Sequence, residues 1–261
     1  NDVNTFVSGK DNDLSGNNAS GILGRENTFK RTNNTLVSGY LNKVEDGSNN
    51  TVFGYLHDVS GITLNTTVMG NKNKEYNGVN NVLAGNLQDA SGVTNTVSQG
   101  ESNKLRSDKN SIVVGKLNET VGNVESGVLG LSNTMTEDKQ TLVLGTSNVT
   151  KKNTNTVVFG NTQDVSGGMN LLVSGKDHEI RNGLNNVIFG NNNTVTDCSD
   201  VMITGSNASV SGSKQSMLSG KQNILMETYA AMGYGALNSI KNADKSLIGG
   251  ALNKIEGGNT N

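Results

Sequence analysis

Side chains that enzymes use for acid–base, nucleophilic or metal chemistry are few in this chain and dispersed along it. There are two histidines, His57 and His178, and a single cysteine, Cys198. One cysteine excludes both an internal disulfide framework and a site built from several cysteines. The aspartates do not recur at the fixed position of a calcium-binding nonapeptide roll: Asp46, Asp58, Asp89, Asp164 and Asp177. We therefore expect no catalytic residue, no cofactor and no repeated metal site, although a single ion at one turn stays open.

The composition limits both the fold and the partners. Only 33% of the 261 residues are hydrophobic and 4% are aromatic, which is too little to fill the core of a compact α/β enzyme. The formal net charge is −2 and no basic block occurs, which argues against a nucleic-acid partner. No apolar run approaches the roughly 18 residues of a membrane span. We expect a protein that is not an enzyme and whose present segment does not contact a membrane.

A series of glycines organises the whole chain. Successive members are 15 residues apart, except for one step of 16 between Gly54 and Gly70. The 17 repeat glycines are Gly9, Gly24, Gly39, Gly54, Gly70, Gly85, Gly100, Gly115, Gly130, Gly145, Gly160, Gly175, Gly190, Gly205, Gly220, Gly235 and Gly250. A fixed period of this kind predicts a repeat architecture.

Three apolar columns accompany the repeat glycines. The residue two before the glycine is Val, Ile or Leu in every unit except at Ser98 and Gly233. The residue three before it is also usually apolar, as at Phe6 and Leu36. The residue five after it is mostly apolar, with Glu75, Thr120 and Thr150 as interruptions. Asparagine fills most positions five before and three after the glycine.

A 15-residue unit is too short for a helical hairpin. Short β-branched runs bounded by Asn and Gly predict two short strands joined by two turns, so the chain is expected to be all-β, a parallel β-solenoid of about 17 coils. Glycine permits a turn that a Cβ would block, and Asn side chains can hydrogen-bond from coil to coil. His57 and His178 both stand three after a repeat glycine, so each is expected to replace a ladder Asn. Cys198 is expected to be a small turn residue.

The two adjacent apolar columns predict the mode of assembly. Successive side chains of a strand point to opposite faces, so the columns two and three before the glycine cannot both face the interior. The more uniform Val/Ile column is expected to face inward, opposite the column five after the glycine, although the reverse assignment stays open. The outward column would expose a long apolar stripe, which predicts parallel self-association of identical chains, in register around an axis.

The repeat resembles that of a known family. Segments such as NTLVSGYLNKV at 34–44 and NTVVFGNTQDV at 155–165 are similar to the YadA-like head of trimeric autotransporter adhesins. The resemblance implies a left-handed parallel β-roll, with residues 1–261 as a single head domain and the neck, stalk and membrane anchor absent. It also implies a homotrimer on the outer membrane of a Gram-negative bacterium. The implied partner is a host-cell receptor, such as a carcinoembryonic-antigen-related adhesion molecule, or a matrix protein such as collagen or fibronectin.

Two other functions stay open. A trimeric phage tail-fibre or spike segment would use the same architecture for attachment. An ice-binding solenoid would display a flat outward array of threonines. Thr or Ser does occupy many positions four before the glycine, but Asn50, Asn81, Leu171, Val201 and Ala231 interrupt that column. The hexapeptide period of β-helical acyltransferases does not fit a repeat of 15.

One aromatic and aliphatic patch stands out from the repeat. Tyr40 and Tyr55 follow repeat glycines in successive units, and each is followed by a leucine, Leu41 or Leu56; Leu87 stands in the same column. Aromatic side chains are frequent in interface hot spots, so these five residues are candidates for binding a partner. The alternative is that they pack on a neighbouring protomer. The extra residue near Ser60–Leu64 is expected to add a loop beside this patch.

Overall fold

The computed structural model describes most of the chain, and every regular element in the described residues is a β-strand. The described residues are 3–177 and, from 179 to 257, all except 182, 193, 201, 210, 218, 225, 228, 231, 237, 240, 243, 246, 248 and 255. No helix long and apolar enough to span a membrane occurs among them. The chain divides into two compact units, Asn1–Ser132 and Asn133–Asn261.

The first unit contains two parallel sheets, one of five-residue strands and one of three-residue strands. The five-residue strands are β1 (Phe6–Lys10), β3 (Gly21–Arg25), β5 (Leu36–Tyr40), β8 (Thr51–Tyr55), β11 (Thr67–Asn71), β13 (Val82–Asn86), β15 (Val97–Glu101), β17 (Ile112–Lys116) and β19 (Gly127–Leu131). The three-residue strands are β2 (Asp13–Ser15), β4 (Thr28–Lys30), β6 (Lys43–Glu45), β9 (Asp58–Ser60), β12 (Lys74–Tyr76), β14 (Asp89–Ser91), β16 (Lys104–Arg106) and β18 (Glu119–Val121). A small third pairing joins β7 (Gly47–Ser48) to β10 (Thr63–Leu64).

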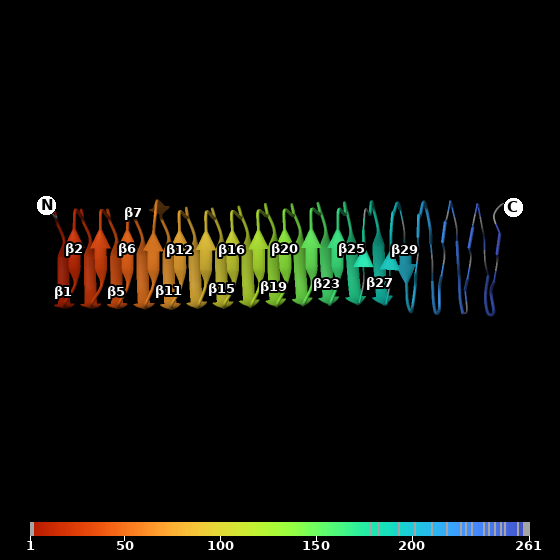
Figure 1. Ribbon diagram of the computed structural model, residues 1–261, viewed down its shortest axis with the longest axis horizontal. Coiled ribbons are helices and arrows are strands. Elements are labelled where there is room, and N and C mark those ends of the chain that lie inside the picture. The colour runs from red at the N-terminus through yellow and green to blue at the C-terminus, as the bar shows by residue number, and fades with distance from the viewer. Residues whose placement is uncertain are drawn as a thin grey trace. The chain divides into compact units, whose positions relative to one another are not determined.

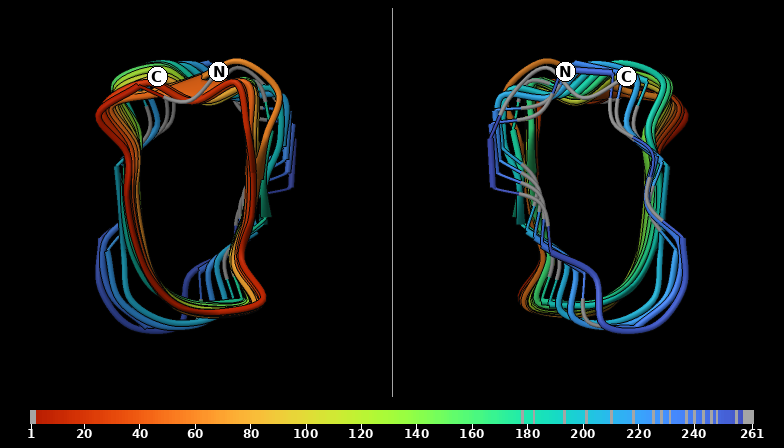
Figure 2. Two further views of the ribbon diagram at one scale, coloured as in Figure 1. Left: turned by 90° about the vertical axis from the view of Figure 1, so that its left-hand side faces the viewer. Right: turned by 90° about the vertical axis from the view of Figure 1, so that its right-hand side faces the viewer.

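The second unit repeats the same arrangement (Figure 1). Its longer strands are β21 (Leu142–Thr146), β23 (Val157–Asn161), β25 (Leu172–Lys176), β27 (Val187–Asn191) and β29 (Met202–Thr204). Its shorter strands are β20 (Thr134–Thr136), β22 (Val149–Lys151), β24 (Asp164–Ser166), β26 (Glu179–Ile180) and β28 (Thr194–Val195). Viewed end-on, successive coils of the first unit follow nearly the same closed outline (Figure 2). The predicted all-β parallel β-solenoid is therefore confirmed.

Strand pairing keeps equivalent residues of successive coils side by side. Val37 pairs with Val52, and Gly39 pairs with Gly54. The 16-residue step does not disturb this register, because Gly54 pairs with Gly70 across the insertion. Each column predicted from the sequence is therefore a physical row of side chains that runs from coil to coil.

The interior of each coil lies between its two sheets. From Ile22 to Ile188 the residues two before the repeat glycine are buried, and so are the residues five after it from Phe29 to Val165; in the first coil Val7 is 44% exposed. This burial confirms that the Val/Ile column faces inward, opposite the column five after the glycine. It also confirms that the column three before the glycine faces outward, where Leu36 is 40% exposed.

The repeat glycines from Gly9 to Gly190 occupy a backbone conformation that no other residue suits. Gly100 has a φ of 123°, and a Cβ added there would lie 1.9 Å from the carbonyl oxygen of Gly115. The next coil therefore approaches too closely for any side chain. The exclusion of a Cβ is as predicted, but the repeat glycines from Gly9 to Gly190 lie within the longer strands and not in turns.

Asparagine forms two ladders with different environments. Inside the coil, Asn42 donates from Nδ2 to the carbonyl oxygen of Gly54 (2.9 Å) and to Asn27 Oδ1 (3.1 Å). On the surface, Asn65 donates to Asn80 Oδ1 (2.8 Å) and Asn80 donates to Asn95 Oδ1 (2.9 Å), with all three residues in the left-handed backbone conformation. These amide bonds confirm the predicted ladders and link each coil to the next.

Candidate functional site

Two outward columns of the longer strands carry no ionisable group, and we call the surface that they form the uncharged face. The residue after the repeat glycine lies outside it and is charged at Lys10, Arg25, Glu101, Lys116 and Lys176. The uncharged face consists of the residues three and one before each repeat glycine. In the first unit these are Phe6, Ser8, Gly21, Leu23, Leu36, Ser38, Thr51, Phe53, Thr67, Met69, Val82, Ala84, Val97, Gln99, Ile112, Val114, Gly127 and Leu129. In the second unit the described members include Leu142, Leu144, Val157, Phe159, Leu172, Ser174, Val187, Phe189, Met202, Thr204, Met217, Ser219, Met232 and Tyr234. None of these side chains is acidic or basic.

The outward side chains of the shorter strands form a surface of opposite character, the charged face. It consists of the residues four and six after each repeat glycine. Lys43 pairs with Glu45 at 3.0 Å and with Asp58 at 3.8 Å, and Arg106 pairs with Asp89 at 2.9 Å. The uncharged face and the charged face of one coil therefore differ in the chemistry of their exposed side chains.

The threonine column that the ice-binding interpretation considered does not lie on either outward face. Thr35, Thr66, Thr96 and Thr156 are buried, and each hydroxyl donates to the carbonyl oxygen two residues earlier, as Thr96 does to Thr94 (3.2 Å). The threonines at this position therefore do not form the outward array that an ice-binding solenoid would display. Side-chain alternation explains the result, because a residue two before an inward Val also points inward.

The predicted aromatic patch is brought together in part. The rings of Tyr40 and Tyr55 stack with centroids 5.4 Å apart, and the Arg25 guanidinium lies 5.7 Å from the centre of the Tyr40 ring. Leu41 and Leu56 lie beside these rings in successive coils, in the left-handed backbone conformation. Leu87 is 47% exposed and belongs to a later coil. Partner binding by these five residues stays a prediction.

The inserted residue lies at a different corner from that patch. Gly61 and Ile62 follow strand β9, whereas Tyr55 and Leu56 precede it. Ile62 is 69% exposed, and its backbone N–H donates to Asn77 Oδ1 (2.9 Å). The expected loop beside the patch is therefore wrong, because β9 separates the two.

His57 replaces a ladder asparagine, as expected. Its backbone N–H donates to Asn42 Oδ1 (3.1 Å), its Nδ1 accepts from the Asn73 N–H (3.2 Å), and its Nε2 lies 3.1 Å from the Phe53 carbonyl oxygen. These contacts suit the neutral ring, and burial lowers the pKa of His57. His178 lies outside the described residues.

Cys198 is buried and unsuited to nucleophilic chemistry. Its thiol donates to the Thr196 carbonyl oxygen, and burial raises its pKa to about 11. Among the described residues no group of three or more His, Cys, Asp or Glu side chains could hold a metal ion.

The burial of three carboxylates, those of Glu75, Asp108 and Asp138, was not predicted from the sequence. Glu75 is 1% exposed, accepts from Asn81 Nδ2 (2.7 Å), and its Oε2 has no partner among the described residues. Burial raises the pKa of Glu75 to about 8. Asp108 accepts from Thr120 Oγ1 (2.6 Å), and burial raises the pKa of Asp108 above its usual value. Asp138 and Thr150 repeat that pair. The sequence does contain a sign of these two Asp–Thr pairs, because each Thr that interrupts the column five after the glycine follows an Asp by 12 residues.

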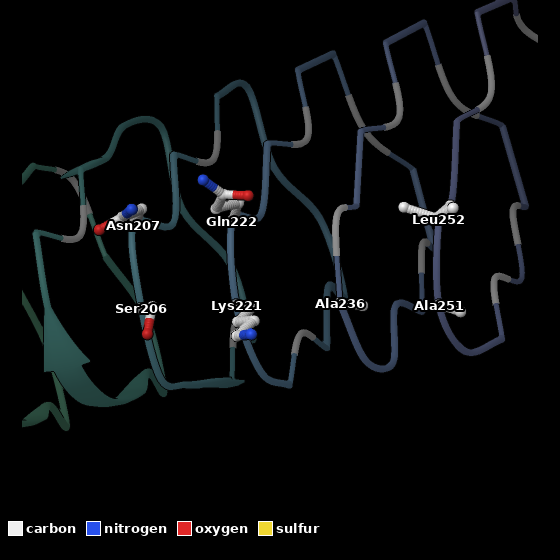
Figure 3. Close-up of a pocket in the computed structure, with 7 residues that line it drawn as sticks. All are labelled: Ser206, Asn207, Lys221, Gln222, Ala236, Ala251 and Leu252. Carbon is white, nitrogen blue, oxygen red and sulfur yellow. The ribbon is translucent and has the colours of Figure 1, made fainter.

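Described residues of the second unit line the following two hollows. One, of about 530 Å³, runs along a corner where Lys221 is the single charged lining residue beside the amides of Asn207 and Gln222 (Figure 3). The other, of about 420 Å³, opens on the uncharged face. Neither brings acidic and basic groups together for catalysis.

The similarity of this chain to known proteins is clear for one family and weak for individual solved structures. No curated protein matches it. Solved structures match weakly: a proposed acetyltransferase from Desulfovibrio desulfuricans G20 is 9% identical with a TM-score of 0.17, over 78% of this chain and 64% of that one. An Arabidopsis UDP-N-acetylglucosamine acyltransferase is 13% identical with a TM-score of 0.16, over 79% of this chain and 64% of its own. Such scores carry no inference about fold or activity.

The family comparison is more extensive. The model of the grass antifreeze β-roll matches residues 1–99 and 135–230, which together make up most of the chain. The matched regions include strands of both units and their outward faces. The chain belongs to the family of grass antifreeze β-rolls.

Proposed function

We propose that this protein binds ice through the uncharged face. The observation that carries the proposal is the absence of ionisable side chains from the columns three and one before the repeat glycine, in every described coil. Charged groups orient water around themselves and compete with the tetrahedral bonding of ice. Apolar and hydroxyl groups leave neighbouring waters bonded to one another, as the lattice requires.

The regularity of the face supports the same proposal. In-register parallel strands repeat at about 4.8 Å, which is close to a spacing of oxygen atoms in the ice lattice. The buried columns and the interior Asn ladder hold the strands in place, so the surface is ordered before it meets ice. Membership of the grass antifreeze β-roll family adds independent support.

Two serines allow a matched test of the face. Ser38 lies on the uncharged face, between Leu23 and Phe53 of the adjacent coils. Ser60 lies on the charged face of the following coil, paired with Tyr76. Ser38→Arg and Ser60→Arg therefore introduce the same side chain on opposite surfaces.

We expect Ser38→Arg to require about tenfold more protein for inhibition of ice recrystallisation, equivalent to ~1.4 kcal/mol of binding free energy. Ser60→Arg should retain the original activity. Circular dichroism melting curves check that both variants remain folded. Equal activity of the two variants would exclude the uncharged face as the ice-binding surface.

The other functional interpretations remain predictions. They are an adhesin head that binds a host receptor or matrix protein at the outer membrane, and a phage tail-fibre segment. We likewise propose that the β-roll is left-handed, that it has 17 coils, that it forms a homotrimer and that it has no enzymatic activity. No described contact favours a receptor over ice.

A further inference from the structure

Three of the seven methionines stand in one row on the uncharged face. Met202, Met217 and Met232 each lie three residues before a repeat glycine, in successive coils. Parallel bridges pair Met202 with Met217 and Met217 with Met232. Their side chains are 45%, 44% and 46% exposed. The same position holds no methionine in any of the preceding coils, so the three are a local cluster.

The methionines share a hollow with neutral neighbours. The cavity of about 420 Å³ is lined by these three side chains together with Thr204, Ser219, Gly233, Tyr234 and Gly249. No carboxylate and no ammonium group lines it. A hard cation such as Mg²⁺ or Ca²⁺ finds no suitable oxygen set here, because those ions favour carboxylates. Thioethers are soft, neutral donors, and soft ligands select soft cations such as Cu(I).

The spacing of the strands matches the length of two metal–sulfur bonds. In-register strands lie about 4.8 Å apart, so equivalent thioethers in paired coils can take up the same separation. A d¹⁰ cation such as zinc lies about 2.3 Å from a sulfur ligand, so a linear S–metal–S unit spans roughly 4.6 Å. Met side chains have three rotatable bonds and can absorb the small difference.

We propose that Met202, Met217 and Met232 form a binding site for a soft monovalent cation of the Cu(I) and Ag(I) class. Two adjacent thioethers hold the ion, and the third either completes a three-coordinate site or provides a second equivalent position. Tyr234 lines the same cavity, and its ring can stabilise the cation through its π face. The proposal does not depend on ice binding.

Ag(I) is the probe for the test because it undergoes no redox change. The Cys198→Ala background removes the only thiol that could compete for silver. Labelling with ¹³C-methyl methionine gives each Met an NMR signal, assigned by single Met→Leu variants. Met69 and Met169 are the matched controls, because they are 39% and 45% exposed but have no methionine partner: Met69 pairs with Phe53 and Ala84, and Met169 with Thr154 and Leu184.

We expect Ag(I) to shift the signals of the three clustered methionines at concentrations that leave Met69 and Met169 unchanged. Met217→Leu should weaken Ag(I) binding by about two orders of magnitude, because the remaining thioethers are no longer adjacent and the second ligand loses its high effective concentration. The Met69→Leu/Met169→Leu variant should bind like the parent.

Two results would overturn the proposal. One is a simultaneous shift of all exposed methionines, which would indicate independent weak contacts. The other is undiminished Ag(I) affinity in Met217→Leu. Loss of ice activity in Ser38→Arg bears only on the ice-binding surface and leaves the silver result unaffected.

Discussion

Glu75 occupies an interior position that neighbouring coils fill with Val59 and Ala90. Its pKa rises from the ordinary 4.5 to about 8, because burial disfavours the charged carboxylate. Between these two pH values the folded chain holds a proton that the unfolded chain has released. The free energy of unfolding therefore falls as pH rises from 4.5 to 8 and levels off above that range.

Glu75→Gln should remove this pH dependence, because an amide keeps the size of the side chain without its ionisation. We expect the variant and the parent to unfold at similar temperatures near pH 4.5. At pH 9 the variant should be more stable by roughly 5 kcal/mol, the product of the pKa difference and ~1.4 kcal/mol per unit. Thermal unfolding followed by circular dichroism across this range is the measurement. A parent protein whose stability does not decline toward pH 9 would contradict the assignment.

Prediction from sequence was uneven at the scale of single residues. The substitution of His57 for an asparagine followed from its position after the glycine, and the structure confirms it. The Asp108–Thr120 pair was missed because a single interruption of an apolar column does not reveal which polar partner compensates for it. The stacking of Tyr40 on Tyr55 followed directly from the repeat, since equivalent positions are adjacent in space.

Strand alternation accounts for most of what could be predicted at the scale of the element. Once the Val/Ile column faces inward, alternation places the residues three and one before the glycine outward and the threonine column inward. The exposed face was therefore predictable, but the sequence reasoning did not apply the rule to the threonines. Alternation also places charged residues such as Lys43 and Glu45 outward on the shorter strands, so the contrast in charge between the two faces could be predicted from the sequence.

Alanine substitutions at Gly100 and Gly92 allow the stability cost of close packing between coils to be measured separately from the cost of the backbone conformation. In Gly100→Ala the new Cβ would lie 1.9 Å from the Gly115 carbonyl oxygen, so we expect a loss of stability above about 4 kcal/mol or a failure to fold. Gly92 has a φ of 64°, and the nearest atom to an added Cβ there is 3.7 Å away. Gly92→Ala should cost only about 1 kcal/mol, the usual penalty for alanine in the left-handed region.

Urea unfolding of the two glycine variants gives the comparison directly. Successive coils approach one another at Gly100 and leave space at Gly92, so the two costs should differ severalfold. Similar losses for both would mean that the stack relaxes around an added methyl group. In that case the close approach of adjacent coils would not be the reason for the repeat glycines.

At the scale of the molecule, ice and a second copy of the chain compete for the same surface. The homotrimer predicted from the sequence would cover the uncharged face, whereas ice binding needs it open. Polar members such as Ser38, Thr51, Thr67 and Gln99 interrupt its apolar columns and weaken the tendency to self-associate. An open ice-binding surface requires the chain to be monomeric at micromolar concentration.

Sedimentation equilibrium of the parent and of Ser38→Arg tests whether sister chains cover the uncharged face or leave it open to ice. A monomeric parent with ice activity fits the proposed function. A stable parent trimer that Ser38→Arg dissociates would show that sister chains cover the face, and would contradict an open ice-binding surface. The sequence could not decide this, because an outward apolar column is compatible with either partner.

The extra residue at Gly61–Ile62 has a practical consequence. The pairing of Gly54 with Gly70 shows that the stack accepts additional chain at this corner and resumes its register in the next coil. The corner follows strand β9 of the charged face and thus lies away from the longer strands. Peptide tags, fluorophores or whole foreign domains could be grafted there, so that the protein could be attached to a support while its other flank stays free to meet a frozen surface.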